Sequence, residues 1–146
     1  MGALVAEAAD EDVQELAKLG WNIGLAFQIQ DDILDSFGDP KLFGKKVGGD
    51  ICQNKKTWLV LKANEVGTAD QVTKLKSLMD DAQLDDDTKV TQVKDLLTEL
   101  NIPALAEQAK GNYQKAAFEN LASLSAPPQK KENLKMVMEQ LIGRTW

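Results

Sequence analysis

Hydrophobic residues recur at helical spacing along most of the chain, most clearly between Glu11 and Phe37. One stripe there comprises Ile23, Ala26, Phe27, Gln30, Ile33, Leu34 and Phe37. Leu25 and Ile29 fall outside that stripe, so the segment predicts one long helix that is apolar on more than one face and central in the fold. Gly38, with Pro40 shortly after it, is expected to end this helix.

The following segment, GDPKLFGKKVGGDIC, is rich in glycine and predicts a loop. Further helices are expected at about residues 54–63, 68–79, 85–100 and 103–124, and the segment SAPPQK separates the last of these from a final helix that ends near Gly143. Thr68 and Gln71 fit a capping box, Asp85 to Asp87 can cap the next helix, and Pro103 suits a first turn. Strand patterns and internal repeats are negligible, so the predicted class is all-α.

Composition narrows the possible functions of these 146 residues, which are enough for one domain. The net charge of −6 argues against a nucleic-acid binder. Cys52 is the only cysteine, which favours a reducing cytoplasm, and no apolar run is long enough for membrane insertion. The chain has no histidine, so any catalysis must use carboxylates, lysines, amides, hydroxyls or metal ions.

Three carboxylates stand close together in the stretch GLAFQIQDDILDSFGDP. Asp31 and Asp35 share one helix face, Asp32 lies about 100° around the helix, and none has a basic neighbour at helical spacing. Repulsion between the carboxylates and the helix macrodipole both disfavour this arrangement. A solvated acidic helix end is the ordinary explanation, but the surrounding residues are apolar and aromatic.

The next segment has the opposite charge. Six lysines and one aspartate lie between Lys41 and Lys62, which gives this segment a charge of +5. Carboxylates followed by a glycine-rich loop with lysines suit a site for Mg²⁺ and a diphosphate, because Mg²⁺ prefers oxygen ligands and lysines bind phosphate. The partner of the carboxylates is therefore predicted to be a metal ion.

These motifs resemble the second aspartate-rich region of the trans-prenyltransferases, the polyprenyl (isoprenyl) diphosphate synthases. The pattern G-x-x-F-Q-x-x-D-D-x-x-D is followed by D-P, by GKKVGGDI and by NKKT. The resemblance implies an antiparallel helix bundle, usually a homodimer, and Mg²⁺-dependent condensation of an allylic diphosphate with isopentenyl diphosphate. It covers about residues 23–61 strongly, and a tyrosine-containing helix near residue 113 is compatible with it.

The resemblance implies roles for single residues. Asp31 is similar to the direct metal ligand, and Asp32 and Asp35 act directly or through bound water. Gln28 would face the allylic end, and Phe27 would line the hydrocarbon cavity or serve as an ordinary core residue. The lysines implied for diphosphate binding are Lys46, or Lys45 if the loop is shifted by one, and Lys55. Asp50 would support the metal or cap the short helix; Lys41, Lys56 and Lys62 would be solvated.

The chain departs from the family pattern in one important respect. Family members are considerably longer and carry an earlier D-D-x-x-D motif followed by paired arginines, whereas Arg144 is the only arginine here. The DDAQLDDD segment follows the second motif and lacks arginines, so it does not replace the first one. We therefore expect residues 1–146 to be the C-terminal portion of a single synthase domain, inactive alone and without the isopentenyl diphosphate site.

Two other functions stay open at this point. A non-catalytic helical binding or regulatory module of the same fold would keep the packing but lose metal-dependent binding. A class I terpene cyclase or head-to-head synthase also uses aspartate-rich helices, although the order of motifs here favours chain elongation. An EF-hand is excluded because its calcium-loop pattern is missing from the sequence.

Overall fold

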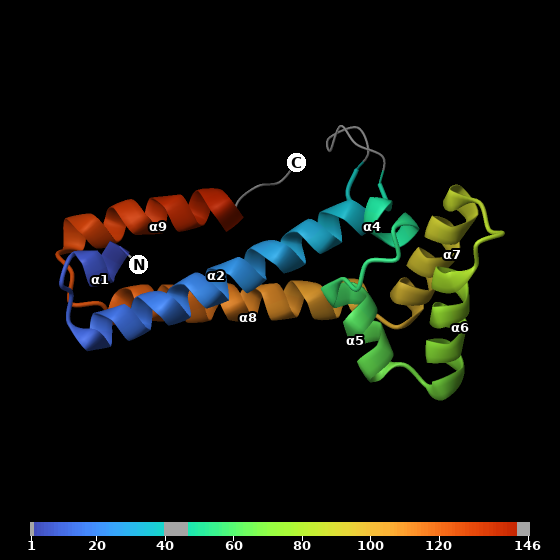
Figure 1. Ribbon diagram of the computed structural model, residues 1–146, viewed down its shortest axis with the longest axis horizontal. Coiled ribbons are helices and arrows are strands. Elements are labelled where there is room, and N and C mark those ends of the chain that lie inside the picture. The colour runs from blue at the N-terminus through green and yellow to red at the C-terminus, as the bar shows by residue number, and fades with distance from the viewer. Residues whose placement is uncertain (1, 40–46, 143–146) are drawn as a thin grey trace. The chain divides into compact units, whose positions relative to one another are not determined.

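The computed structural model describes residues 2–39 and 47–142, which form helices and the connections between them (Figure 1). The helices are α1 (Gly2–Val5), α2 (Asp10–Phe37), α4 (Gly49–Cys52), α5 (Trp58–Val66), α6 (Ala69–Asp80), α7 (Asp86–Glu99), α8 (Ile102–Ser123) and α9 (Pro128–Ile142). None of the described residues lies in a strand, and the predicted all-α class is confirmed.

The chain divides into two compact units, with the boundaries inside its two longest helices. Unit 1 contains residues up to Gln28 and those from Ala109 onward, and so includes α1, α9, the first part of α2 and the later part of α8. Unit 2 contains the described residues between Ile29 and Gln108. The three carboxylates Asp31, Asp32 and Asp35, called the carboxylate cluster below, lie in unit 2.

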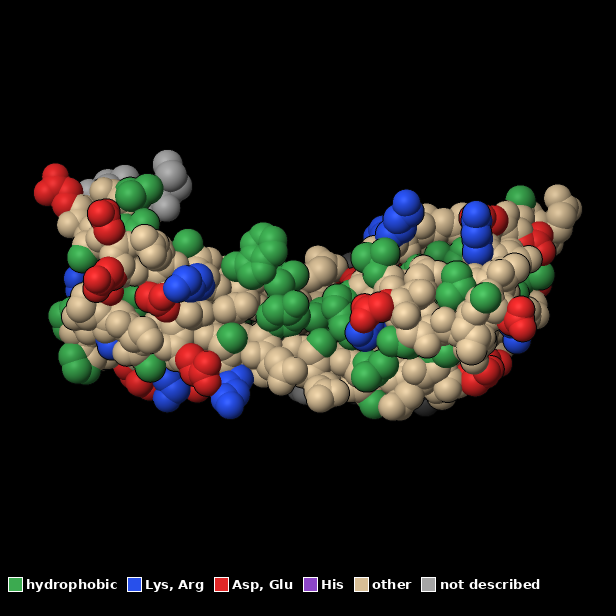
Figure 2. Space-filling view, turned by 90° about the horizontal axis from the view of Figure 1, so that it is seen from below, with side chains coloured by type: hydrophobic (Ala, Val, Ile, Leu, Met, Phe, Trp, Pro, Cys, Tyr) green, Lys and Arg blue, Asp and Glu red, His purple; other side chains and the backbone are tan. Residues whose placement is uncertain are grey.

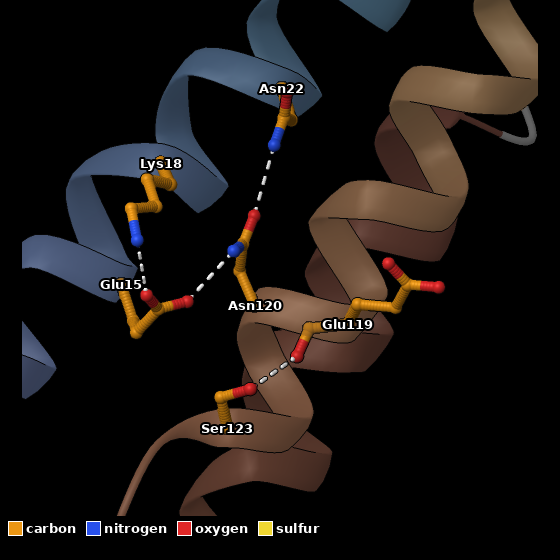
Figure 3. A network of polar contacts seen from close by, with 6 residues as sticks. All are labelled: Glu15, Lys18, Asn22, Glu119, Asn120 and Ser123. Atoms are coloured by element: carbon orange, nitrogen blue, oxygen red, sulfur yellow. Dashed lines mark hydrogen bonds and ion pairs between the residues drawn. The ribbon is translucent and has the colours of Figure 1, made fainter.

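Unit 1 is held together by an apolar core and by a polar ladder. The core joins α2, α8 and α9 through Leu19, Ala117, Leu121, Leu124 and Met138. The ladder begins at Asn22, whose Nδ2 donates to Asn120 Oδ1 at 2.9 Å (Figure 3). Asn120 Nδ2 donates to Glu15 Oε2 at 2.8 Å, and Lys18 Nζ lies 2.6 Å from Glu15 Oε1. Asn120 of α8 can reach both Asn22 and Glu15 of α2 in only one alignment of the two helices, so these hydrogen bonds select the register between α2 and α8.

Unit 2 is organised around α7, which contacts α4, α5 and α6. Its core consists of Ile29, Ile51, Leu59, Val60, Ala63, Leu75, Met79, Val93, Leu96, Leu97, Ile102 and Ala106. Helices α6 and α7 lie side by side (Figure 1). The short helices that follow the carboxylate cluster are therefore supported by α7 from within the same unit.

The long helix and several helix starts agree with the sequence prediction. α2 begins one residue before the predicted start and ends at Phe37 as expected. The capping box of Thr68 and Gln71 is present, and Asp85 caps α7 by accepting from the Thr88 N–H. Ile29, outside the predicted stripe, is among the most deeply buried residues, which agrees with an α2 that is apolar on more than one face.

Two predictions between α2 and α6 are wrong. The segment predicted as a loop contains the short helix α4, and α5 begins at Trp58, four residues later than predicted. The later start arises because Thr57 is the N-cap, its Oγ1 accepting from the Val60 N–H at 3.3 Å, while Asn54 has a left-handed φ of 54°. The predicted end of the last helix at Gly143 lies outside the described residues.

The surface mixes charged and apolar side chains. Acidic and basic residues are interspersed with exposed hydrophobic ones on the face drawn in Figure 2. The large hydrophobic residues that are exposed are Leu4, Trp21, Leu61, Val66, Met136 and Val137. Over the described residues, the helices fall short of the length and apolarity needed to cross a membrane.

Truncating the core of unit 2 tests this packing. Leu97 is fully buried in α7, so Leu97→Ala should lower the free energy of unfolding by about 2–5 kcal/mol through lost burial and a residual cavity. Leu61→Ala is the matched control, because Leu61 is 55% exposed, and it should cost less than about 1 kcal/mol. Urea unfolding measures both, and equal losses would contradict the assigned core.

Candidate functional site

The three carboxylates of the cluster occupy different environments at the end of α2. Asp31 is exposed, Asp35 is half-buried, and Asp32 is only 2% exposed. Asp32 shares its buried face with Ile29 and Ser36, at helical spacing. The neighbouring aspartates Asp31 and Asp32 therefore cannot play equivalent parts.

Asp32 anchors the start of α5. Its Oδ2 accepts from the backbone N–H of Trp58 at 2.7 Å, and Trp58 is the first residue of α5. This N–H has no partner within its own helix, and the helix N-terminus carries partial positive charge. The contact offsets part of the cost of burying the carboxylate. Asp32 thus has a structural role that the motif alone did not indicate, although its place beside Ile29 and Ser36 was a readable signal.

Asp35 fastens the turn formed by residues 48–55 to the end of α2. Its carboxylate Oδ2 accepts from the Asp50 N–H at 2.9 Å, and its backbone carbonyl accepts from the Gly48 N–H at 2.6 Å. Gly48 has a φ of 90°, a conformation that favours glycine. The glycine-rich sequence therefore allows the chain to turn back directly against the carboxylate cluster.

The same turn brings a lysine to the cluster. Lys55 Nζ lies 2.5 Å from Asp50 Oδ1, and the Lys55 N–H donates to the Asp50 carbonyl at 2.9 Å. The Lys55 side chain remains about half exposed, so its ammonium is accessible to solvent. Asp35, Asp50 and Lys55 thus form one connected series of contacts.

Burial, hydrogen bonds and neighbouring carboxylates together shift the pKa values of two groups at this site. Burial raises the pKa of Asp35; hydrogen bonding from the Asp50 N–H opposes that shift, and the charges of Asp50 and Asp32 add to it. The Lys55 pKa is raised, first by its hydrogen bond to Asp50 and then by the charge of Asp50, with smaller effects from Asp35 and Asp32. A bound cation would relieve the repulsion that Asp35 experiences.

The donor chemistry suits a hard cation, because carboxylate oxygens are the ligands that Mg²⁺ prefers. Across residues 2–39 and 47–142, however, no group of three or more His, Cys, Asp or Glu residues is placed to hold a metal ion. The candidate metal ligands Asp31, Asp32, Asp35 and Asp50 thus stay predictions.

The other predicted site residues are distributed as follows. Lys46, its competitor Lys45 and also Lys41 lie outside the described residues. Phe27 is half-buried and Gln28 is exposed, and both belong to unit 1. These assignments also stay predictions.

The structure also bears on two minor residues. Asp50 does not act as a helix cap, because the N-caps of α4 and α5 are Gly48 and Thr57. Lys62 forms an exposed ion pair with Glu65, its Nζ lying 2.7 Å from Glu65 Oε1.

Sequence reasoning also missed Lys89. This lysine is buried in α7, on the helix face that carries Val93, Leu96 and Leu97. A charged residue in line with core positions was the signal that could have revealed it.

Comparison with known proteins identifies the family. The sequence pattern of the family described as polyprenyl synthetase matches residues 1–99. The chain belongs to this family. That result confirms the resemblance inferred from the motifs around Asp31 and Asp35.

Relatives of this chain are longer proteins. It is similar to farnesyl pyrophosphate synthase 1 of Cannabis sativa, with 34% identity over 137 residues, which cover 93% of this chain and 37% of the relative. A crystal structure of a geranylgeranyl pyrophosphate synthase matches 99% of this chain and 45% of its own chain, with a TM-score of 0.82 and 37% identity. The chain therefore spans less than half the length of these relatives.

A second solved structure supports the fold. It is a geranylgeranyl pyrophosphate synthase from Corynebacterium glutamicum complexed with isoprenyl diphosphate and magnesium. It matches 99% of this chain and 41% of its own chain, with a TM-score of 0.80 and 22% identity. The expected isoprenoid-synthase type of helix bundle is thereby confirmed as the fold to which this chain corresponds.

The two adjacent aspartates should differ in their effect on stability. Asp32→Ala removes a buried acceptor and leaves the Trp58 N–H without it, so the free energy of unfolding should fall by about 1.5–3 kcal/mol. Asp31→Ala, the control, changes an exposed side chain and should stay within about 0.5 kcal/mol. Chemical unfolding followed by circular dichroism distinguishes them. Equal effects would refute the anchoring role of Asp32.

The raised pKa of Asp35 predicts a pH-dependent gain from Asp35→Asn. A carboxyl whose pKa is raised by folding stabilises the fold below its ordinary pKa of 3.8, and this contribution is lost as pH rises through the folded value. The wild-type chain should therefore lose stability relative to Asp35→Asn between acidic and neutral pH. The amide oxygen can still accept from the Asp50 N–H.

Thermal unfolding of both proteins across that range measures the difference. Asp95→Asn, which makes the same change at an exposed position of α7, serves as the control. A variant at Asp35 that is less stable at neutral pH than at acidic pH, relative to wild type, would contradict the direction of the shift.

Proposed function

We propose that this chain supplies one wall of a Mg²⁺-dependent prenyl-transfer site, where an allylic diphosphate condenses with isopentenyl diphosphate. The observation that carries the proposal is the connected series Asp35, Asp50 and Lys55, which joins the carboxylate cluster to a lysine. Family membership and the complex of the similar corynebacterial protein with isoprenyl diphosphate and magnesium support it.

In the proposed reaction the bond between the allylic carbon and the diphosphate oxygen breaks, and the electron pair leaves with the diphosphate. The double bond of isopentenyl diphosphate then attacks the resulting allylic cation to form the new carbon–carbon bond, and loss of a proton to the departed diphosphate restores an alkene. When bound, Mg²⁺ would neutralise charge on the diphosphate and favour its departure. Asp31 and Asp35 would offer carboxylate oxygens to the ion, with water and diphosphate completing its coordination.

Lys55 would bind the diphosphate directly. Its ammonium, now paired with Asp50, is accessible enough to exchange that carboxylate for a diphosphate oxygen. Lys46 would bind the same group, on the strength of the family resemblance. Phe27 would line the hydrocarbon cavity and Gln28 would face the allylic end, both on the strength of the family resemblance. A homodimer in the cytoplasm belongs to the same proposal.

A reconstitution assay tests this function. The 146-residue chain alone should not incorporate isopentenyl diphosphate, because one wall leaves the departing diphosphate without the donors of the first aspartate-rich motif. Adding the N-terminal part of a family member that carries this motif should generate Mg²⁺-dependent activity. Activity of the chain alone would overturn the one-wall assignment, and inactivity of every mixture would favour a non-catalytic module.

In an active mixture, Asp31→Ala should lower the turnover rate by about 100-fold or more, because departure of the diphosphate loses metal assistance. Asp95→Ala removes an exposed carboxylate from α7 and should leave the rate nearly unchanged. Near-normal turnover of the Asp31 variant would refute its assignment as a metal ligand.

A further inference from the structure

Lys89 is a buried lysine whose ammonium is held by two uncharged oxygens. The residue is 6% exposed, and Nζ donates to Asn54 Oδ1 at 2.6 Å and to the Met79 carbonyl at 2.5 Å. Met79 lies in the last turn of α6, where backbone carbonyls carry partial negative charge. This carbonyl compensates part of the cost of burying a charge. The second contact, to Asn54, reaches into the candidate site.

Asn54 is the residue directly before Lys55 and lies just after α4, near the end of the turn of residues 48–55. It has a φ of 54°, and its N–H donates to the Ile51 carbonyl at 3.0 Å. Asparagine is one of the few residues besides glycine that adopt left-handed backbone readily, so the sequence itself favours this conformation. The hydrogen bond from Lys89 then fixes the Asn54 side chain at the point where the Lys55 backbone begins.

The other end of this turn, at Gly48, packs against Val90, the residue that follows Lys89 in α7. Gly48, with its φ of 90°, approaches Val90 so closely that a Cβ built on the glycine would lie 2.6 Å from both Val90 γ-carbons. Lys89 and Val90, which are adjacent in α7, thus contact both ends of the turn of residues 48–55. Asp35 holds that turn from α2.

We propose that Lys89 is a positioning residue for diphosphate binding, which acts through Asn54 to place Lys55. The inference rests on the function proposed above, because Lys55 must bind the diphosphate for its placement to matter. A lysine has a long flexible side chain, so its reach toward a ligand depends on where its backbone is held. Holding Asn54 in place lowers the ordering that Lys55 must undergo when it exchanges Asp50 for a phosphate oxygen.

Diphosphate affinity of the 146-residue chain, measured by calorimetry with inorganic diphosphate and MgCl₂ well below the melting temperature, tests the proposal. Lys89→Met and Asn54→Gly should each weaken binding by about three- to tenfold. Glycine is chosen at position 54 because it tolerates the left-handed φ while removing the side chain. The double variant should bind no more weakly than the weaker single variant, because both changes break the same contact.

Lys74→Met is the charge-matched control, because it removes an exposed lysine from α6, and it should change affinity less than twofold. If Lys89→Met weakens binding but Asn54→Gly does not, Lys89 acts through its charge and the positioning role is overturned. Unchanged affinity in Lys89→Met, with only a lower melting temperature, also overturns it.

Lys55→Ala separates this inference from the function on which it rests. If the wild-type chain binds diphosphate and Lys55→Ala weakens binding, the proposed function stands and the Lys89 results are decisive for the positioning role. If Lys55→Ala binds as tightly as wild type, the assigned part of Lys55 in the proposed function fails, and the positioning role fails with it.

Discussion

Two hydrogen bonds from the Gly48–Asp50 segment to Asp35 hold the glycine-rich turn against the end of α2, and the candidate site depends on them. One uses the Asp35 carboxylate and the other its backbone carbonyl, so the residue fixes the turn with two different groups. Without them, the carboxylates of α2 and the ammonium of Lys55 would be parts of separate segments. With them, the turn brings the ammonium of Lys55 to the carboxylates at the end of α2, so that both belong to one site.

This arrangement has an electrostatic cost that the protein alone does not remove. The pKa of Asp35 is raised by burial and by the nearby carboxylates, and Lys55 opposes only part of that effect. Asp32 differs from Asp35, because its carboxylate accepts a hydrogen bond from the Trp58 N–H at the start of α5. A site with surplus negative charge at Asp35 and an accessible lysine nearby is suited to a divalent cation that bridges to a diphosphate. The cost in stability and the proposed function therefore have the same origin.

Much of this could be predicted from the sequence wherever local rules decide the structure. The long α2 follows from continuous helical spacing that ends at Gly38, and the start of α6 follows from the reciprocal bonds of Thr68 and Gln71. The family followed from the order of motifs, which needs no geometry. The confirmed parts are thus those in which neighbours along the chain settle the outcome.

The features that the sequence did not reveal depend on contacts between residues that lie far apart in the chain. The glycines around position 48 indicate a loop locally, but contacts with Asp35 and Val90 allow a helical turn there. The motif places Asp32 beside Asp31, and only the approach of α5 reveals that Asp32 is also a buried anchor. Lys89 acquires its contacts from α6 and from the turn after α4, neither of which its own helix could reveal.

The most direct test of the account is the dependence of diphosphate binding on Mg²⁺, measured by calorimetric titration of the chain with inorganic diphosphate. The carboxylates should repel diphosphate on its own and bind it when a divalent cation bridges the two. We therefore predict clear binding in excess Mg²⁺ and at least about a tenfold weaker interaction in the presence of a chelator. Equal affinity under the two conditions would contradict the central claim that the carboxylates at the end of α2 take up diphosphate through a metal ion.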